Sequence, residues 1–162
     1  MATNNSINTT RSAFEVQTSA TISNVTGDGT QYNILFDNTV FDLGSNVTLN
    51  SGGKTIFTAP KTGIYFFYAG VCLSGVSSTV TGGELALLLG GGTMIIDAKN
   101  PYNSAGSPTV GPQFSGGKLV SLSANATVAL YILIRGSVKD VDIAFFNAPP
   151  YSTTFFGGYF LS

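Results

Sequence analysis

The sequence of 162 residues predicts a single all-β domain, built as an antiparallel sandwich or barrel. Short segments that alternate apolar and polar residues follow one another, and Gly, Pro and Asn separate them. No segment shows a sustained helical period with caps. The length is typical of one domain and suffices to bury a hydrophobic core.

The first third of the chain begins with a polar arm, after which five strands are predicted. Residues 1–12 are polar and lack periodicity, so we expect them to be disordered or to become ordered against a partner. In 13–21, apolar residues such as Phe14 and Val16 alternate with polar ones such as Glu15. The other strands predicted here are 31–36, 39–43, 47–49 and 54–58.

Residues 64–73 are apolar on both faces, which is typical of a central strand rather than a surface ribbon. A face that is not in the core must meet water or another subunit, so we expect a subunit to cover it. The segment 99–113 contains three prolines and predicts a long loop. The remaining predicted strands are 84–89, 93–98, 116–123, 127–135, 140–147 and 154–161.

Charge is scarce in this chain, because only 9% of the residues are charged and the net charge is −1. Uncharged polar residues replace them: 19 Thr, 17 Ser and 12 Asn. The absence of a basic stripe argues against a nucleic-acid partner. No apolar run reaches the roughly 20 residues of a membrane span. The N-terminal arm lacks the apolar centre of a signal peptide.

The chain has no histidine, which excludes Ser-His-Asp and Cys-His catalysis and removes the commonest metal ligand. The single cysteine, Cys72, excludes an internal disulfide and a zinc site with several cysteines. Cys72 lies in an apolar run and is interpreted as a buried, inert thiol. The alternatives are an intermolecular disulfide and a nucleophile. We expect no enzymatic activity.

Two groups of residues are candidates for ligand binding. Asp140 and Asp142 are two residues apart, so on a strand they share a face, and with Asp97 they are candidate Ca²⁺ ligands. A solvated strand edge that prevents aggregation explains the same carboxylates. Tyr102 and Tyr151 lie in or beside loops, where tyrosines stack on sugars or anchor protein partners, or simply pack against the loop.

Residues 51–68 combine a glycine-rich turn, a short strand that ends in Phe-x-x-Pro, a turn glycine and an aromatic strand. This stretch resembles the most recognisable part of the complement component 1q globular head. The positions that carry the resemblance are Gly53, Phe57, Pro60, Gly63, Tyr65 and Phe67, with Phe36-Asp37 before them. Segment 13–16 is similar to the opening strand of that family. Segment 154–157 is similar to the closing strand of that family and of the related tumour necrosis factor family.

The resemblance implies that residues 13–162 form a jelly-roll sandwich of about ten antiparallel strands, which assembles as a compact homotrimer without catalytic activity. It also implies that Tyr68 and Phe155 face the three-fold axis, and Phe66 joins them because it shares a strand face with Tyr68. The alternative is that all three fill the monomer core. No collagen-like Gly-x-y tract is present, so we expect a distant microbial or viral member.

These observations predict a surface structural or binding module, located on a virion or an extracellular surface. The first hypothesis is a capsid decoration or fibre head, whose N-terminal arm contacts a capsid or coat protein. The first alternative is a bacterial spore- or cell-surface adhesion head. The second is a carbohydrate-binding module that contacts surface glycans. Apart from the possible Ca²⁺ ion, we expect no cofactor.

Overall fold

The computed structural model describes residues 12–104, 111–146 and 152–162, in which the regular elements are strands and one short 3-10 turn. The strands are β1 (Ala13–Gln17), β2 (Ile22–Thr26), β3 (Gln31–Asn33), β4 (Asn38–Leu43), β5 (Val47–Thr48), β6 (Ile56–Thr58), β7 (Gly63–Ser74), β8 (Gly82–Leu89), β9 (Gly92–Lys99), β10 (Gln113–Leu122), β11 (Thr127–Arg135), β12 (Val141–Ile143) and β13 (Phe155–Phe160). The turn, η1, is Tyr102–Ser104. The all-β prediction is confirmed.

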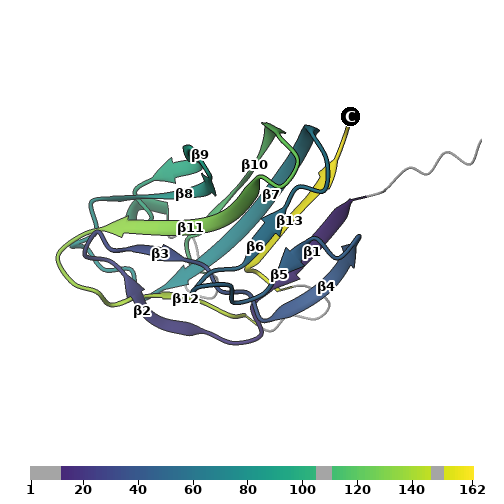
Figure 1. Ribbon diagram of the computed structural model, residues 1–162. Coiled ribbons are helices and arrows are strands. Elements are labelled where there is room, and N and C mark those ends of the chain that lie inside the picture. The colour runs from purple at the N-terminus through teal and green to yellow at the C-terminus, as the bar shows by residue number, and fades with distance from the viewer. Residues whose placement is uncertain (1–11, 105–110, 147–151) are drawn as a thin grey trace, which may run out of the picture.

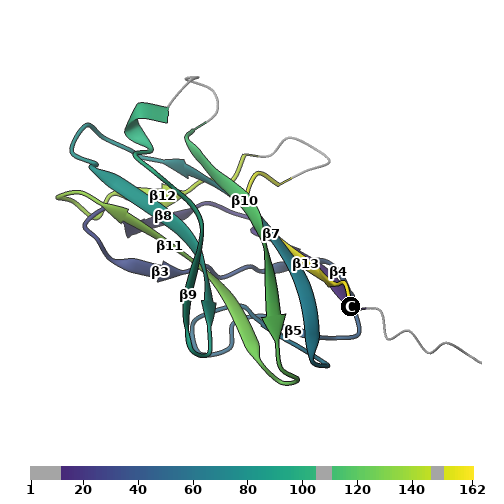
Figure 2. The same ribbon diagram turned by 90° about the horizontal axis from the view of Figure 1, so that it is seen from above.

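The strands form two antiparallel sheets that pack face to face (Figures 1 and 2). The first sheet has the order β2-β12-β7-β13-β1-β4, and β10 also pairs with β7. The second has the order β5-β6-β11-β8-β9, and β3 also pairs with β11. Most neighbours within a sheet are far apart in sequence, as the crossing connections of a jelly roll require.

Aromatic side chains from both sheets fill the core between them. Phe57 from the second sheet stacks on Phe14, with ring centroids 4.9 Å apart, and meets Phe67 edge-on at 5.4 Å. Phe14 also meets Phe156 edge-on at 5.1 Å. All four rings are buried, and these offset and T-shaped contacts are the arrangements that aromatic quadrupoles favour.

β7 is the central strand of the first sheet, as the apolar segment 64–73 predicts. It pairs with β10 along one edge and with β13 and β12 along the other. Side chains alternate between faces along a strand, so Tyr65, Phe67 and Ala69 enter the core while Phe66 and Tyr68 point away from it. The strand therefore has an aromatic side that the monomer core does not cover.

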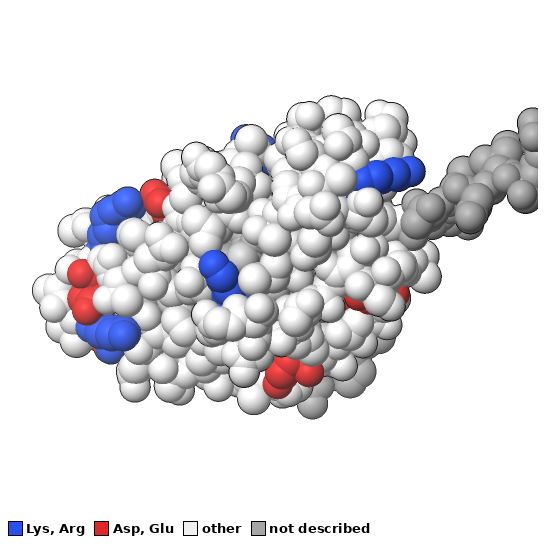
Figure 3. Space-filling view, in the orientation of Figure 1, with Lys and Arg blue, Asp and Glu red and all other residues white. Residues whose placement is uncertain are grey.

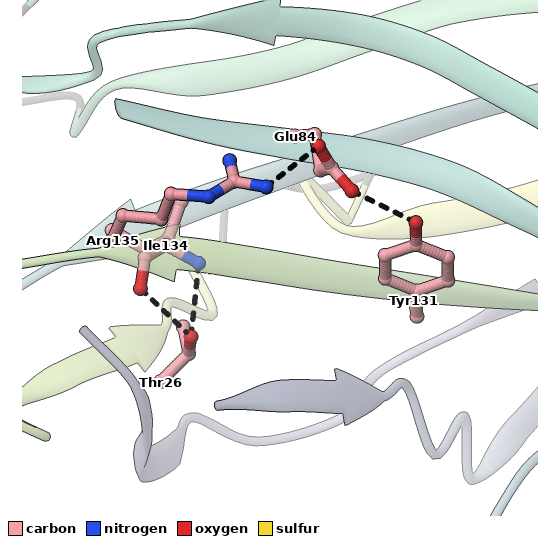
Figure 4. Close-up of polar contacts among 5 residues, drawn as sticks. All are labelled: Thr26, Glu84, Tyr131, Ile134 and Arg135. Carbon is pink, nitrogen blue, oxygen red and sulfur yellow. Dashed lines mark hydrogen bonds and ion pairs between the residues drawn. The ribbon is translucent and has the colours of Figure 1, made fainter. Parts of the chain in front are cut away.

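The prediction did not include β2, which the sequence marks poorly. Ser23 and Asn24 are exposed, and Asn24 has a positive φ of 55°. The strand depends on remote partners: it pairs with β12, and the backbone N–H of Asn24 donates to Asp142 at 2.8 Å. The Thr26 hydroxyl accepts from the Ile134 N–H at 3.0 Å and so joins β2 to β11 (Figure 4).

Several predicted boundaries were also wrong. The strand predicted at 140–147 contracts to β12, whose register is irregular where it pairs with β2. The loop predicted at 99–113 contains η1 and ends at β10, which begins three residues earlier than the predicted 116. Ser12, the last residue of the predicted polar arm, is buried, and its carbonyl accepts from the Phe160 N–H at 2.9 Å. Residues 1–11 lie outside the described part.

Candidate functional site

The face of the first sheet that points away from the core is the candidate site, and we call it the aromatic face. Strand register sets its side chains in three rows that cross β10, β7, β13, β1 and β4 in that order. The first row is Leu119, Phe66, Tyr159, Ala13 and Leu43. The second is Gly117, Tyr68, Gly157, Glu15 and Phe41. The third is Ser115, Gly70, Phe155, Gln17 and Asn38.

Three rings of this face each lie over a glycine of the neighbouring strand. A Cβ atom built on each glycine would meet a ring atom of its partner at 2.4–2.6 Å, which is closer than real Cβ contacts. The pairs are Tyr68 over Gly157, Phe155 over Gly70 and Phe66 over Gly117. The glycines thus leave room for the rings to lie along the sheet, and an interior glycine in a strand is typical of such a close approach.

Large apolar side chains of the aromatic face remain exposed in the single chain. The exposed fractions are 60% for Leu119, 49% for Leu43, 41% for Tyr159 and 40% for Phe41. They occupy the first row and the end of the second, so they extend over both edges of the five strands. Contiguous apolar patches of this kind mark interaction surfaces in soluble proteins.

The structure places all three predicted trimer-interface residues on this one face. Phe66, Tyr68 and Phe155 are half-buried and belong to the aromatic face rather than to the core. The Tyr68 ring contacts both of the others, with centroids 6.4 Å from Phe66 and 6.1 Å from Phe155. Their role at a trimer axis stays a prediction.

Glu15 is the only residue of the three rows that is charged at neutral pH. One carboxylate oxygen accepts from the Tyr68 hydroxyl at 3.0 Å, and the other accepts from the Gln17 amide at 3.0 Å. Burial raises the pKa of Tyr68 above its usual value, and the hydrogen bond and charge of Glu15 raise it further. Tyr68 is therefore a neutral hydrogen-bond donor to Glu15 at physiological pH.

An open cavity of about 350 Å³ lies beside this pair. It is lined by Glu15, Gln17, Tyr68, Ser152 and Phe155. The rings of Tyr68 and Phe155 are tilted by 50° to one another. The volume of this cavity falls within the range of small-molecule pockets, which is about 300–1,000 Å³.

A second Glu–Tyr pair lies on the second sheet (Figure 4). Glu84 accepts from the Tyr131 hydroxyl at 2.9 Å and from the Arg135 guanidinium at 3.1 Å. Burial, and then the hydrogen bond to Glu84, raise the pKa of Tyr131. On the face of the molecule that Figure 3 shows, charged side chains are few and most of the visible surface is uncharged.

The three candidate Ca²⁺ ligands do not form a common site. Asp97 accepts from Lys99 at 2.8 Å and from the Ser115 N–H at 3.1 Å. Asp142 accepts from the Asn24 N–H at 2.8 Å, while Asp140 has one buried oxygen without a partner among the described residues. Within residues 12–104, 111–146 and 152–162, no group of three or more His, Cys, Asp or Glu is placed to hold a metal ion.

The remaining candidates lie apart from the aromatic face or outside the described residues. Tyr102 is exposed on η1, and Tyr151 falls outside the described part of the chain. Cys72 is fully buried beside the Gly111 carbonyl, and burial raises its thiol pKa. These properties are typical of an inert thiol. No helix in the described residues is long and apolar enough to cross a membrane.

No protein-family model and no curated protein sequence matches this chain. Solved structures do match it. Murine APRIL at pH 8.0 is 15% identical with a TM-score of 0.56, over 93% of this chain and 99% of that chain. The globular domain of zebrafish complement 1qA protein is also 15% identical with a TM-score of 0.56, over 93% of this chain and 98% of that chain. The chain therefore has the jelly-roll fold shared by the complement 1q and tumour necrosis factor-like domains.

Proposed function

We propose that this protein is a non-enzymatic surface module that assembles as a homotrimer through the aromatic face. The observation that carries the proposal is the set of three rings that lie over glycines on a face outside the core. Strand register continues this face across five strands, and only Glu15 is charged at neutral pH. The fold, together with the homotrimer that the sequence resemblance implies, supports a three-fold arrangement.

The hydrophobic effect supplies the driving force for this assembly. Leu119, Tyr159, Phe41 and Leu43 are each at least 40% exposed in the single chain. Removing apolar surface from water yields roughly 25 cal/mol per Å², so covering this face favours association. The rings also lose little conformational freedom on association, because they already lie over the neighbouring strands.

A binding or structural role is favoured over catalysis by the side chains that are present. The sequence has no histidine, and its one thiol is buried. The acidic side chains are dispersed, and two of them, Glu84 and Asp97, are held in ion pairs. General acid–base and nucleophilic catalysis need such groups gathered around a substrate.

We place the module on a virion surface, as a capsid decoration or fibre head. The low charge content and the cover of Ser, Thr and Asn suit a durable exposed coat, and the polar residues 1–11 suit contact with a shell protein. The alternative setting is a spore- or cell-surface adhesion head. The neighbourhood of the encoding gene tests this setting: capsid or tail genes support it, and cellular metabolic genes contradict it.

The trimer has a direct test in the mass of the protein in solution. Light scattering at micromolar concentration is expected to give about three times the 16.8 kDa of one chain. Association of this kind also makes the melting temperature depend on protein concentration. A mass of one chain over the whole concentration range would contradict the proposal.

Gly157→Ala is expected to weaken the trimer more than it weakens the fold. The new methyl group would lie 2.4 Å from the Tyr68 ring, so the ring must leave its place on the sheet. We expect the trimer to dissociate at roughly tenfold higher protein concentration. Because the dissociation constant of a trimer scales with the square of concentration, this corresponds to about 2.7 kcal/mol per trimer. Sedimentation over a dilution series measures this change.

Gly82→Ala is the matched control for this substitution. Gly82 also lies in a strand, but a Cβ atom there meets nothing within 4 Å. The control variant should dissociate at the same concentration as the original protein. Equal behaviour of the two variants would show that the position of the Tyr68 ring does not matter for assembly.

A further inference from the structure

Glu15 has a negative charge that its neighbours do not neutralise. Its two hydrogen-bond donors, the Tyr68 hydroxyl and the Gln17 amide, are both uncharged. Among the described residues, the ion pairs are Lys99 with Asp97 and Arg135 with Glu84, and neither includes Glu15. A carboxylate on a largely apolar face is costly when that face loses water, unless a cation pairs with it.

Glu84 forms the same kind of pair with a tyrosine elsewhere in this chain, and there a cation accompanies the carboxylate. Both glutamates accept from a tyrosine hydroxyl, at 3.0 Å for Glu15 and 2.9 Å for Glu84. Glu84 also has the guanidinium of Arg135 at 3.1 Å (Figure 4). In place of that cation, Glu15 has the neutral Gln17 amide and faces an open cavity.

The cavity beside Glu15 has the walls that an organic cation requires. The rings of Tyr68 and Phe155 line it, with their planes tilted by 50°. The faces of aromatic rings attract ammonium and guanidinium groups electrostatically. A carboxylate accepts up to about four hydrogen bonds, and Glu15 uses two, so acceptor positions remain.

We propose that this cavity binds an organic cation, an ammonium or guanidinium group, against Glu15, Tyr68 and Phe155. Every lining residue belongs to one chain, so the site exists without the proposed trimer and goes beyond it. The cation has two possible sources, a free small molecule or a basic side chain of a second copy. A neutral sugar would stack on the rings of Tyr68 and Phe155 without needing the negative charge of Glu15. Removing that charge therefore distinguishes a cation from a sugar as the ligand.

The first test titrates the protein with tetramethylammonium and follows the aromatic resonances by NMR. The original protein is expected to bind this probe, and Glu15→Gln is expected to bind it about tenfold more weakly, since it removes the charge but keeps the shape. Glu84→Gln is the matched control and should bind as the original does. Equal affinity of Glu15→Gln and the original protein, or of tert-butyl alcohol and tetramethylammonium, would overturn the proposal.

The second test distinguishes the two sources through the oligomer. If the cation is a free small molecule, it offsets the charge of Glu15 when the trimer covers the aromatic face. Tetramethylammonium then stabilises the original trimer, which dissociates at a lower protein concentration, and Glu15→Gln removes this effect. If a basic side chain of a second copy supplies the cation, the Glu15→Gln trimer dissociates at about tenfold higher protein concentration. Tetramethylammonium then competes with that side chain and weakens the original trimer. A Glu15→Gln trimer at least as tight as the original, with no response of either to the probe, would contradict both. A protein that stays monomeric contradicts the proposed function, while the NMR titration still decides the cation site.

Discussion

Tyr68→Asp is expected to convert the proposed trimer into folded monomers. Tyr68 occupies the second position of the second row, and its ring touches both Phe66 and Phe155. A carboxylate there would be desolvated without a partner, and one such group costs about 3–5 kcal/mol. The nearby carboxylate of Glu15, which now accepts from the Tyr68 hydroxyl, would add like-charge repulsion.

The mass and the fold of this variant are measured separately. Light scattering should give 16.8 kDa, the mass of one chain, while far-UV circular dichroism should keep the signal of a β protein. Gln31→Asp adds the same charge at an exposed position of β3, on the other sheet, and should remain trimeric. A Tyr68→Asp trimer of unchanged stability would show that the side chain is solvated in the assembly.

Part of this face could be predicted from the sequence alone. Residues 64–73 are apolar at both odd and even positions, which indicates a strand whose two faces are both covered. Period-two counting then assigns Phe66 and Tyr68 to one face, and the family resemblance adds Phe155. The local pattern could not decide whether that face is the core, because this depends on which strands pair with β7, and β10 and β13 lie far along the chain.

The glycines and Glu15 are the parts of the site that the sequence reasoning missed. Gly117 and Gly157 stand inside predicted strands, and an interior glycine in a strand is a signal for close approach. That signal does not identify the ring that lies over it, because the partner belongs to another strand. Glu15 likewise looked like an ordinary polar residue of an alternating strand, since its partner Tyr68 is 53 positions away.

Phe67, the neighbour of Tyr68 on β7, is expected to determine the stability of the single chain rather than the assembly. Phe67 is fully buried and packs against the rings of Phe14, Phe57 and Phe156. Phe67→Ala should cost about 3–5 kcal/mol in the free energy of unfolding, from lost burial and the cavity that remains. A loss below about 1 kcal/mol would show that these rings collapse into the space.

Urea denaturation of Phe67→Ala is best measured in the Tyr68→Asp background, because association otherwise adds a stabilisation of the folded state that rises with the logarithm of protein concentration. In that monomeric background, the midpoint should fall with little change in the slope, which depends on the surface exposed by unfolding. Substitutions at two adjacent positions would then separate the free energy of unfolding of one chain from the free energy of association. Phe67 contributes to the stability of one chain, and Tyr68 to the contact between chains, because a single strand presents them to opposite sides of the sheet.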